Sequence, residues 1–192
     1  MSVTTTPRRR SLLQRFGLGR SSASFAIAAN GATAQVAPPQ SQACESGTAL
    51  VPGVRLFHDG SGRPPSVGDD NNGSTRVETA EFDGSYVSLV ADLPPELASR
   101  IRPGVNLAIR IEVEADPALP VFVRGHFGNE EGREVLHDLI VLKDGPRTVR
   151  FNLDGLRIPL DLATTGWVDI VCSNPSGATL TVRKIALEIE AQ

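Results

Sequence analysis

The chain has 192 residues, of which 40% are hydrophobic, and it carries a net charge of −3. This length is sufficient for one domain with a substantial core. The charge is uneven, because residues 1–44 contain five arginines and no acid, which leaves −8 on residues 45–192. An acidic body argues against nucleic-acid binding. No apolar run reaches about 18 residues, so no transmembrane helix is expected. The two cysteines are too few for a disulfide framework.

Residues 1–46 are expected to form a basic, flexible leader and linker. The segment Arg9-Arg10-Ser11-Leu12-Leu13-Gln14 resembles a twin-arginine export signal. Alternatively, Ser11–Leu18 forms a short basic amphipathic helix that touches an anionic membrane or an acidic partner, or the whole segment is a disordered tail. The arginines available for docking are Arg8, Arg9, Arg10, Arg15 and Arg20. If the leader docks to a membrane, the protein is expected in the cytoplasm with peripheral membrane contact. If the leader is an export signal, the protein is expected outside the cytoplasm.

The first part of the body is predicted to contain a strand, a long loop and a hairpin. Gly53–His58 has the composition of a strand, and Asp59–Ser74 is a loop crowded with Gly, Pro, Asp and Asn. Loops of this length are often functional. The dipeptide Asp83-Gly84 suits a type I′ turn, which predicts a hairpin between strands at 77–82 and 85–92.

The second part of the body is predicted to be almost entirely strand. A short helix is expected within Leu93–Arg102, between prolines at its start and Pro103-Gly104 at its end. In Val105–Glu114 apolar and polar side chains alternate with a period of two residues, which is typical of a half-buried strand. Further strands bounded by turn residues are expected at 119–127, 133–142, 147–153, 166–173 and 179–190.

The last of these segments changes its apolar phase at Arg183-Lys184, which predicts a β-bulge. Strands of this spacing without long helices favour an all-β fold. We therefore predict an antiparallel, jelly-roll-like β-sandwich over residues 47–192, with one short helix.

Six segments are considered together: Gly47–Leu50, Gly53–Asp59, Phe82–Leu89, Asp92–Pro94, Gly166–Val171 and Val182–Ile185. They resemble an uncharacterised bacterial family of domain-of-unknown-function proteins, family 6478. The likeness covers roughly Gly47 to Ile189. A looser resemblance links the closing strands to galactose-binding-like and carbohydrate-binding-module β-sandwiches. The family resemblance implies no activity, so no functional residues are carried over.

The sequence carries no recognisable catalytic or cofactor motif. A nucleophile elbow, a phosphate loop, a dinucleotide fingerprint and a Cys-x-x-Cys pair are all missing. His58, His126 and His137 could bind a metal only if their strands converge. The run Asp69–Gly73 does not have the spacing of a calcium loop, and Glu130-Glu131 is typical of a solvated loop. We expect no metal, no cofactor and no enzymatic activity, and a hydrolase is the least supported alternative.

The strongest candidate for binding is a polar sheet face. Aromatic rings combined with Arg, Asn and Asp side chains suit a sugar, provided that the three strands that carry them are neighbours. The structural alternative is that the single Trp is a core anchor. The predicted face comprises Phe122, Arg124, His126, Arg150, Asn152, Trp167 and Asp169.

The predicted function is that of a noncatalytic module that recognises a carbohydrate or cell-envelope glycan through this face. The alternative is a structural or adaptor protein that docks to a membrane surface or an acidic partner through its arginine-rich leader. The expected partners are accordingly a glycan or a protein, with no nucleic acid.

Overall fold

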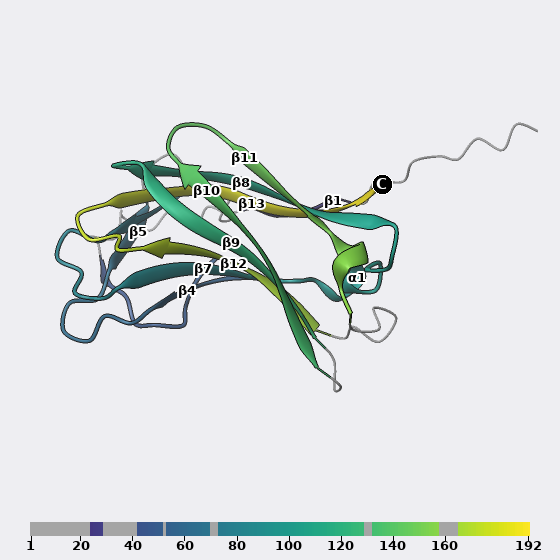
Figure 1. Cartoon of the computed structure of the whole chain (residues 1–192). Coiled ribbons are helices and arrows are strands. Elements are labelled where there is room, and N and C mark those ends of the chain that lie inside the picture. Colours follow the sequence, from purple (N-terminus) through teal and green to yellow (C-terminus); the bar gives the residue numbers. More distant parts are fainter. Residues whose placement is uncertain (1–23, 29–41, 52, 70–72, 129–131, 158–164) are drawn as a thin grey trace, which may run out of the picture.

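The computed structural model describes residues 24–28, 42–51, 53–69, 73–128, 132–157 and 165–192. Within these residues two antiparallel sheets stack face to face, which confirms the predicted β-sandwich (Figure 1). Sheet A has the strand order β11-β8-β13-β6-β5-β2, and β1 also pairs with β13. Sheet B has the order β10-β9-β12-β7-β4-β3.

The strands of sheet A are β1 (Ser24–Ala28), β2 (Gln42–Ala43), β5 (Ser66–Asp69), β6 (Thr75–Glu78), β8 (Val105–Asp116), β11 (Arg147–Asn152) and β13 (Thr179–Ala191). Those of sheet B are β3 (Thr48–Val51), β4 (Val54–His58), β7 (Tyr86–Asp92), β9 (Leu119–Gly128), β10 (Arg133–Leu142) and β12 (Thr165–Ser173). The helical elements are the one-turn helix α1 (Pro95–Ala98) and the 3₁₀ turn η1 (Leu153–Gly155).

The core lies between the inner faces of the two sheets. Along β8 the side chains of Leu107, Ile109 and Ile111 are fully buried, as the two-residue period predicts. The predicted bulge in β13 is confirmed, because its register with β8 shifts between Val182 and Lys184. The extra residue returns the later aliphatic side chains of the strand to the core face.

The predicted hairpin around Asp83-Gly84 is wrong. The strand before it, β6, belongs to sheet A, and the strand after it, β7, belongs to sheet B. Neither Asp83 nor Gly84 has the positive φ that a type I′ turn requires. Instead Phe82 is buried in the core, and the Asp83 carboxylate accepts hydrogen bonds from the backbone N–H groups of Ser61 and Gly62. The segment therefore connects the two sheets.

The sandwich also includes residues inside the expected leader and inside the expected loop. Strands β1 and β2 precede residue 47, and β5 lies within the loop predicted at 59–74. Cys44, which the sequence placed in the leader, is a buried core residue whose carbonyl oxygen lies 2.9 Å from Nε2 of His58. Cys44 and Cys172 are both buried and unbonded to each other.

The leader interpretations concern residues that lie mostly outside the described ranges. All five candidate docking arginines, Arg8, Arg9, Arg10, Arg15 and Arg20, are outside them. In the part of the chain that is described, no helix has the length and apolar character needed to cross a membrane.

Candidate ligand-binding site

The outer face of sheet B brings polar side chains from four neighbouring strands together. The register places Arg124 of β9 opposite Asp169 of β12, and Asp169 opposite Val90 of β7. In the next row Val171 of β12 lies opposite Ser88 of β7. Residues in register on one face of an antiparallel sheet are close neighbours, so these rows form a continuous surface.

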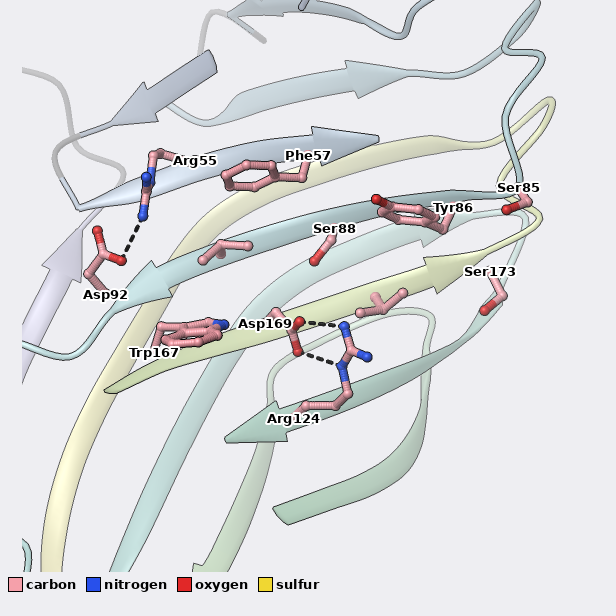
Figure 2. Close-up of a pocket in the computed structure, with 12 residues that line it drawn as sticks. Arg55, Phe57, Ser85, Tyr86, Ser88, Asp92, Arg124, Trp167, Asp169 and Ser173 are labelled. Atoms are coloured by element: carbon pink, nitrogen blue, oxygen red, sulfur yellow. Dashed lines mark hydrogen bonds and ion pairs between the residues drawn. The ribbon is translucent and has the colours of Figure 1, made fainter. Parts of the chain in front are cut away.

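This surface is hollowed into an open pocket of about 790 Å³. Aromatic, charged and hydroxyl side chains surround the hollow, and Figure 2 shows Trp167, Tyr86 and Phe57 around its centre. The lining residues are Arg55, Phe57, Ser85, Tyr86, Ser88, Val90, Asp92, Arg124, Trp167, Asp169, Val171 and Ser173.

A bidentate ion pair lies at the floor of the hollow. Nε of Arg124 donates to Oδ1 of Asp169 at 2.8 Å, and Nη2 of Arg124 donates to Oδ2 (Figure 2). Asp169 is only 5% exposed, and its hydrogen bond with Arg124 raises the pKa of the guanidinium. A second pair, Arg55 with Asp92 at 2.9 Å, lies at the exposed rim. Each arginine of the lining thus faces a carboxylate.

The single tryptophan stands on the same floor, stacked on a histidine. The rings of His126 and Trp167 have centroids 4.5 Å apart and planes 9° from parallel. His126 lies opposite Trp167 on the neighbouring strand β9 and does not line the hollow, so it supports the indole ring from the side and leaves it as part of the lining. The guanidinium of Arg133 also lies 5.7 Å from the Trp167 ring centroid.

His126 is expected to make the stability of the protein depend on pH. Burial lowers the pKa of His126 below its ordinary 6.5, with a further contribution from Arg124, while Asp169 acts in the opposite direction. The unfolded state therefore binds this proton more readily. The contribution of His126 to the free energy of unfolding is complete above pH 6.5 and declines as the pH falls toward the depressed value.

Urea unfolding measured between pH 7.5 and pH 5 should reveal this decline. The variant His126→Phe keeps a ring against Trp167 but does not titrate, so its stability should change less over the same interval. Identical slopes for the two proteins would show that His126 does not carry the effect.

Ser88 adds a hydroxyl group that the protein leaves unused. The residue is 3% exposed, yet its Oγ atom has no hydrogen-bond partner. Figure 2 shows the side chain between Phe57 and Asp169, directed into the hollow. A buried hydroxyl without a partner costs free energy unless a ligand or water satisfies it. Ser88 is thus a candidate hydrogen-bonding group for a ligand.

Asp59 does not line the hollow, but it holds two residues of the rim in place. Its carboxylate accepts hydrogen bonds from the backbone N–H and the hydroxyl of Ser85 and from the backbone N–H of Tyr86. The hydrogen bond from the Ser85 side chain is the main cause that lowers the pKa of Asp59. Ser85 and Tyr86 both line the hollow, so the loop after β4 fixes their place in the site.

The structure brings together five of the seven residues predicted for the binding face. These are Phe122, Arg124, His126, Trp167 and Asp169, all on the outer face of β9 and β12.

Arg150 and Asn152 lie elsewhere, on the outer face of sheet A, because β11 pairs with β8. Arg150 donates to Glu190, and Asn152 accepts from the backbone N–H of Asp154 at the start of η1. The period-two pattern identified the outward side of β11 correctly, but it carries no information about which sheet the strand joins.

The contributions of β4 and β7 to the site were missed. Tyr86 and Ser88 of β7 face outward, opposite the buried side chains of Val87 and Leu89. The same alternation could have found them, but the predicted hairpin placed this strand beside the wrong partner. Within the described ranges, no three His, Cys, Asp or Glu side chains gather as metal ligands would.

The fold and the hollow together define a β-sandwich protein with an open site on one sheet face. The chain belongs to the family of unknown function DUF6478, whose model matches residues 22–190. This confirms the predicted family resemblance and extends it on the N-terminal side of Gly47. A comparison with curated proteins finds no match.

Several solved structures are similar to this chain. A Stig cyclase, Fisc from Fischerella sp. TAU, is 11% identical, with a TM-score of 0.54 over 88% of this chain and 99% of that one. A family 11 carbohydrate-binding module of Clostridium thermocellum is 14% identical, with a TM-score of 0.43 over 86% of this chain and 94% of that one. A carbohydrate-binding module named CBM4 is 21% identical, with a TM-score of 0.43 over 72% of this chain and 96% of that one. At these identities the likeness concerns the fold alone.

Proposed function

We propose that this protein is a noncatalytic binding module that recognises a carbohydrate through the outer face of sheet B. The observation that carries the proposal is the hollow of about 790 Å³ in which aromatic rings surround paired charges. A sugar ring presents C–H groups on its faces and hydroxyl groups around its edge. Trp167, Tyr86 and Phe57 can contact the faces, while the Arg124–Asp169 pair and Ser88 can bind the hydroxyl groups.

The paired charges make the site preorganised for a polar ligand. The side chains of Arg124 and Asp169 hold each other in place, so little conformational entropy remains to be lost when a ligand binds. Each carboxylate retains lone pairs and each guanidinium retains N–H groups beyond those used in the pair. The lining therefore offers donors and acceptors without a net charge, which suits a neutral sugar.

The same pairing supports a binding role over hydrolysis. Glycoside hydrolysis uses two carboxyl groups, one as an acid and the other as a base or nucleophile. The carboxylates of the lining are Asp92 and Asp169, and each is bound to an arginine. Both carboxylates of the lining are thus engaged in ion pairs, so neither is free to serve as the acid.

Binding can be tested with a glycan array followed by calorimetry on the glycans that bind. Trp167→Ala is expected to weaken binding about tenfold, which corresponds to about 1.4 kcal/mol, because it removes the large apolar ring that would contact the face of the sugar. Arg124→Ala should also weaken binding. The matched control is Arg150→Ala, which removes the same side chain from the outer face of sheet A and should leave affinity unchanged. Absence of any bound glycan, or equal affinity for Trp167→Ala and the native protein, would refute the proposal.

A further inference from the structure

An apolar stripe lies beside the hollow on the same sheet face. Four large hydrophobic side chains of the described residues are strongly exposed: Phe122 (42%), Val135 (46%), Leu139 (56%) and Val141 (53%). All four lie on β9 or β10 and point outward from sheet B. Single exposed apolar residues are normal, whereas a gathering of them on one face indicates a contact surface.

Three of the four residues are continuous with the hollow, whereas the exposed His137 separates Val135 from them on β10. Leu139 lies opposite Phe122, and Phe122 lies opposite Val171, which lines the hollow. Val141, on the same face of β10, lies opposite Pro120 in the adjoining row. From β12 to β10 the stripe spans two strand spacings, about 10 Å. A ligand in the hollow could thus extend over the stripe without leaving the sheet.

The chemistry of the stripe differs from that of the hollow. Leu and Val side chains offer neither hydrogen bonds nor a flat ring for stacking, and they gain from contact with hydrocarbon. A sugar alone would leave Phe122, Leu139 and Val141 in water. We propose that the ligand is an amphiphilic glycoside, with its sugar head in the hollow and an alkyl or acyl chain over these three residues. This inference rests on the proposed function.

A second copy of the chain is a less suitable occupant of the stripe. One way for it to bind is to extend sheet B at the edge strand β10, where Glu134 and Asp138 project on the inner side between the outward residues. Asp138 is exposed there, and charges on the inward side of an edge strand oppose pairing with another strand. A flexible hydrocarbon chain can lie on the outer face without meeting those charges.

The test uses the full chain and calorimetry with methyl, hexyl and octyl glycosides of glucose, galactose and mannose, below their critical micelle concentrations. Complete burial of one methylene group raises the affinity roughly fourfold, and partial burial on an open sheet face raises it about twofold. The step from hexyl to octyl should therefore increase affinity about fourfold or more. Leu139→Ser and Val141→Thr should reduce this increase but leave the affinity for the methyl glycoside unchanged, and Thr148→Ser on sheet A serves as the control.

Four other outcomes would overturn the inference, and they can be distinguished from one another. Binding that depends on Trp167 but not on chain length would refute the amphiphilic ligand and leave carbohydrate recognition standing. Equal binding of octyl phosphocholine would show unspecific adsorption to the stripe. Concentration-dependent dimerisation that Leu139→Ser abolishes would assign the stripe to a second copy. Failure of every glycoside to bind, short or long, would reject the proposed function together with the inference.

Discussion

Replacing Ile170 with alanine is expected to lower the free energy of unfolding by about 2–5 kcal/mol. Ile170 is fully buried in the centre of β12, where it lies opposite Leu89 on one side and Val123 on the other. Both neighbours are also fully buried, so the side chain is surrounded by atoms that cannot move far to fill the space. The loss combines the transfer free energy of the removed methylene and methyl groups with the cost of the cavity.

The adjacent residue provides the control for this prediction. Val171 points to the opposite side of β12 and is only half-buried, at the wall of the hollow. Val171→Ala should cost less than about 1.5 kcal/mol, because part of the removed surface is already in water. Both variants can be compared by urea unfolding followed by circular dichroism. Equal losses would contradict the register of β12, since a shift of one residue exchanges its two faces.

The sequence predicted the faces of the strands well because side-chain alternation is a local property. In β8 and β12 each residue faces inward or outward as the two-residue period requires. The bulge in β13 was predictable for the same reason, since a change of phase within one strand is visible without knowledge of its neighbours.

The partners of the strands were not predictable from local pattern. Asp83-Gly84 has the residues of a tight turn, but burial of Phe82 and the hydrogen bonds of Asp83 to the 61–62 backbone outweigh that preference. Similarly, Arg150 was assigned to the binding face because β11 has the correct alternation. In the structure, however, β11 pairs with β8 in sheet A. Contacts of this kind join residues far apart in the chain, and the periodicity of a single segment does not encode them.

The candidate site was therefore predicted in part. The residues of β9 and β12 were found because aromatic and charged side chains alternate with aliphatic ones in both strands. Alternation can place Ser88 on the outer face, but the missing hydrogen-bond partner of its hydroxyl and the role of Asp59 could not be found in this way. A serine in an apolar strand carries no signal by itself, and the contacts of Asp59 with Ser85 and Tyr86 depend on a loop that returns across 26 residues.

Removal of the Arg124 side chain should produce the second large effect, because it leaves a buried carboxylate without its partner. Loss of one member of a fully buried ion pair costs about 3–5 kcal/mol. The Arg124 side chain is 42% exposed, so solvent screening reduces the expected loss for Arg124→Ala to about 1–3 kcal/mol. The double variant Arg124→Met, Asp169→Leu should be more stable than the summed losses of Arg124→Met alone and Asp169→Leu alone predict, because neither charge then remains buried without its partner. Urea unfolding of the single and double variants measures this coupling, and strict additivity would contradict it.

The neighbouring histidine reports the same change independently of stability. Nε2 of His126 lies 3.4 Å from Oδ2 of Asp169, and the charges of Arg124 and Asp169 shift its pKa in opposite directions. Arg124→Ala should therefore raise the pKa of His126, and Asp169→Asn should lower it. Titration of the ring C–H signals by NMR can measure both shifts. Shifts of the same sign would mean that a general loosening of the sheet face, rather than the two charges, governs the protonation of His126.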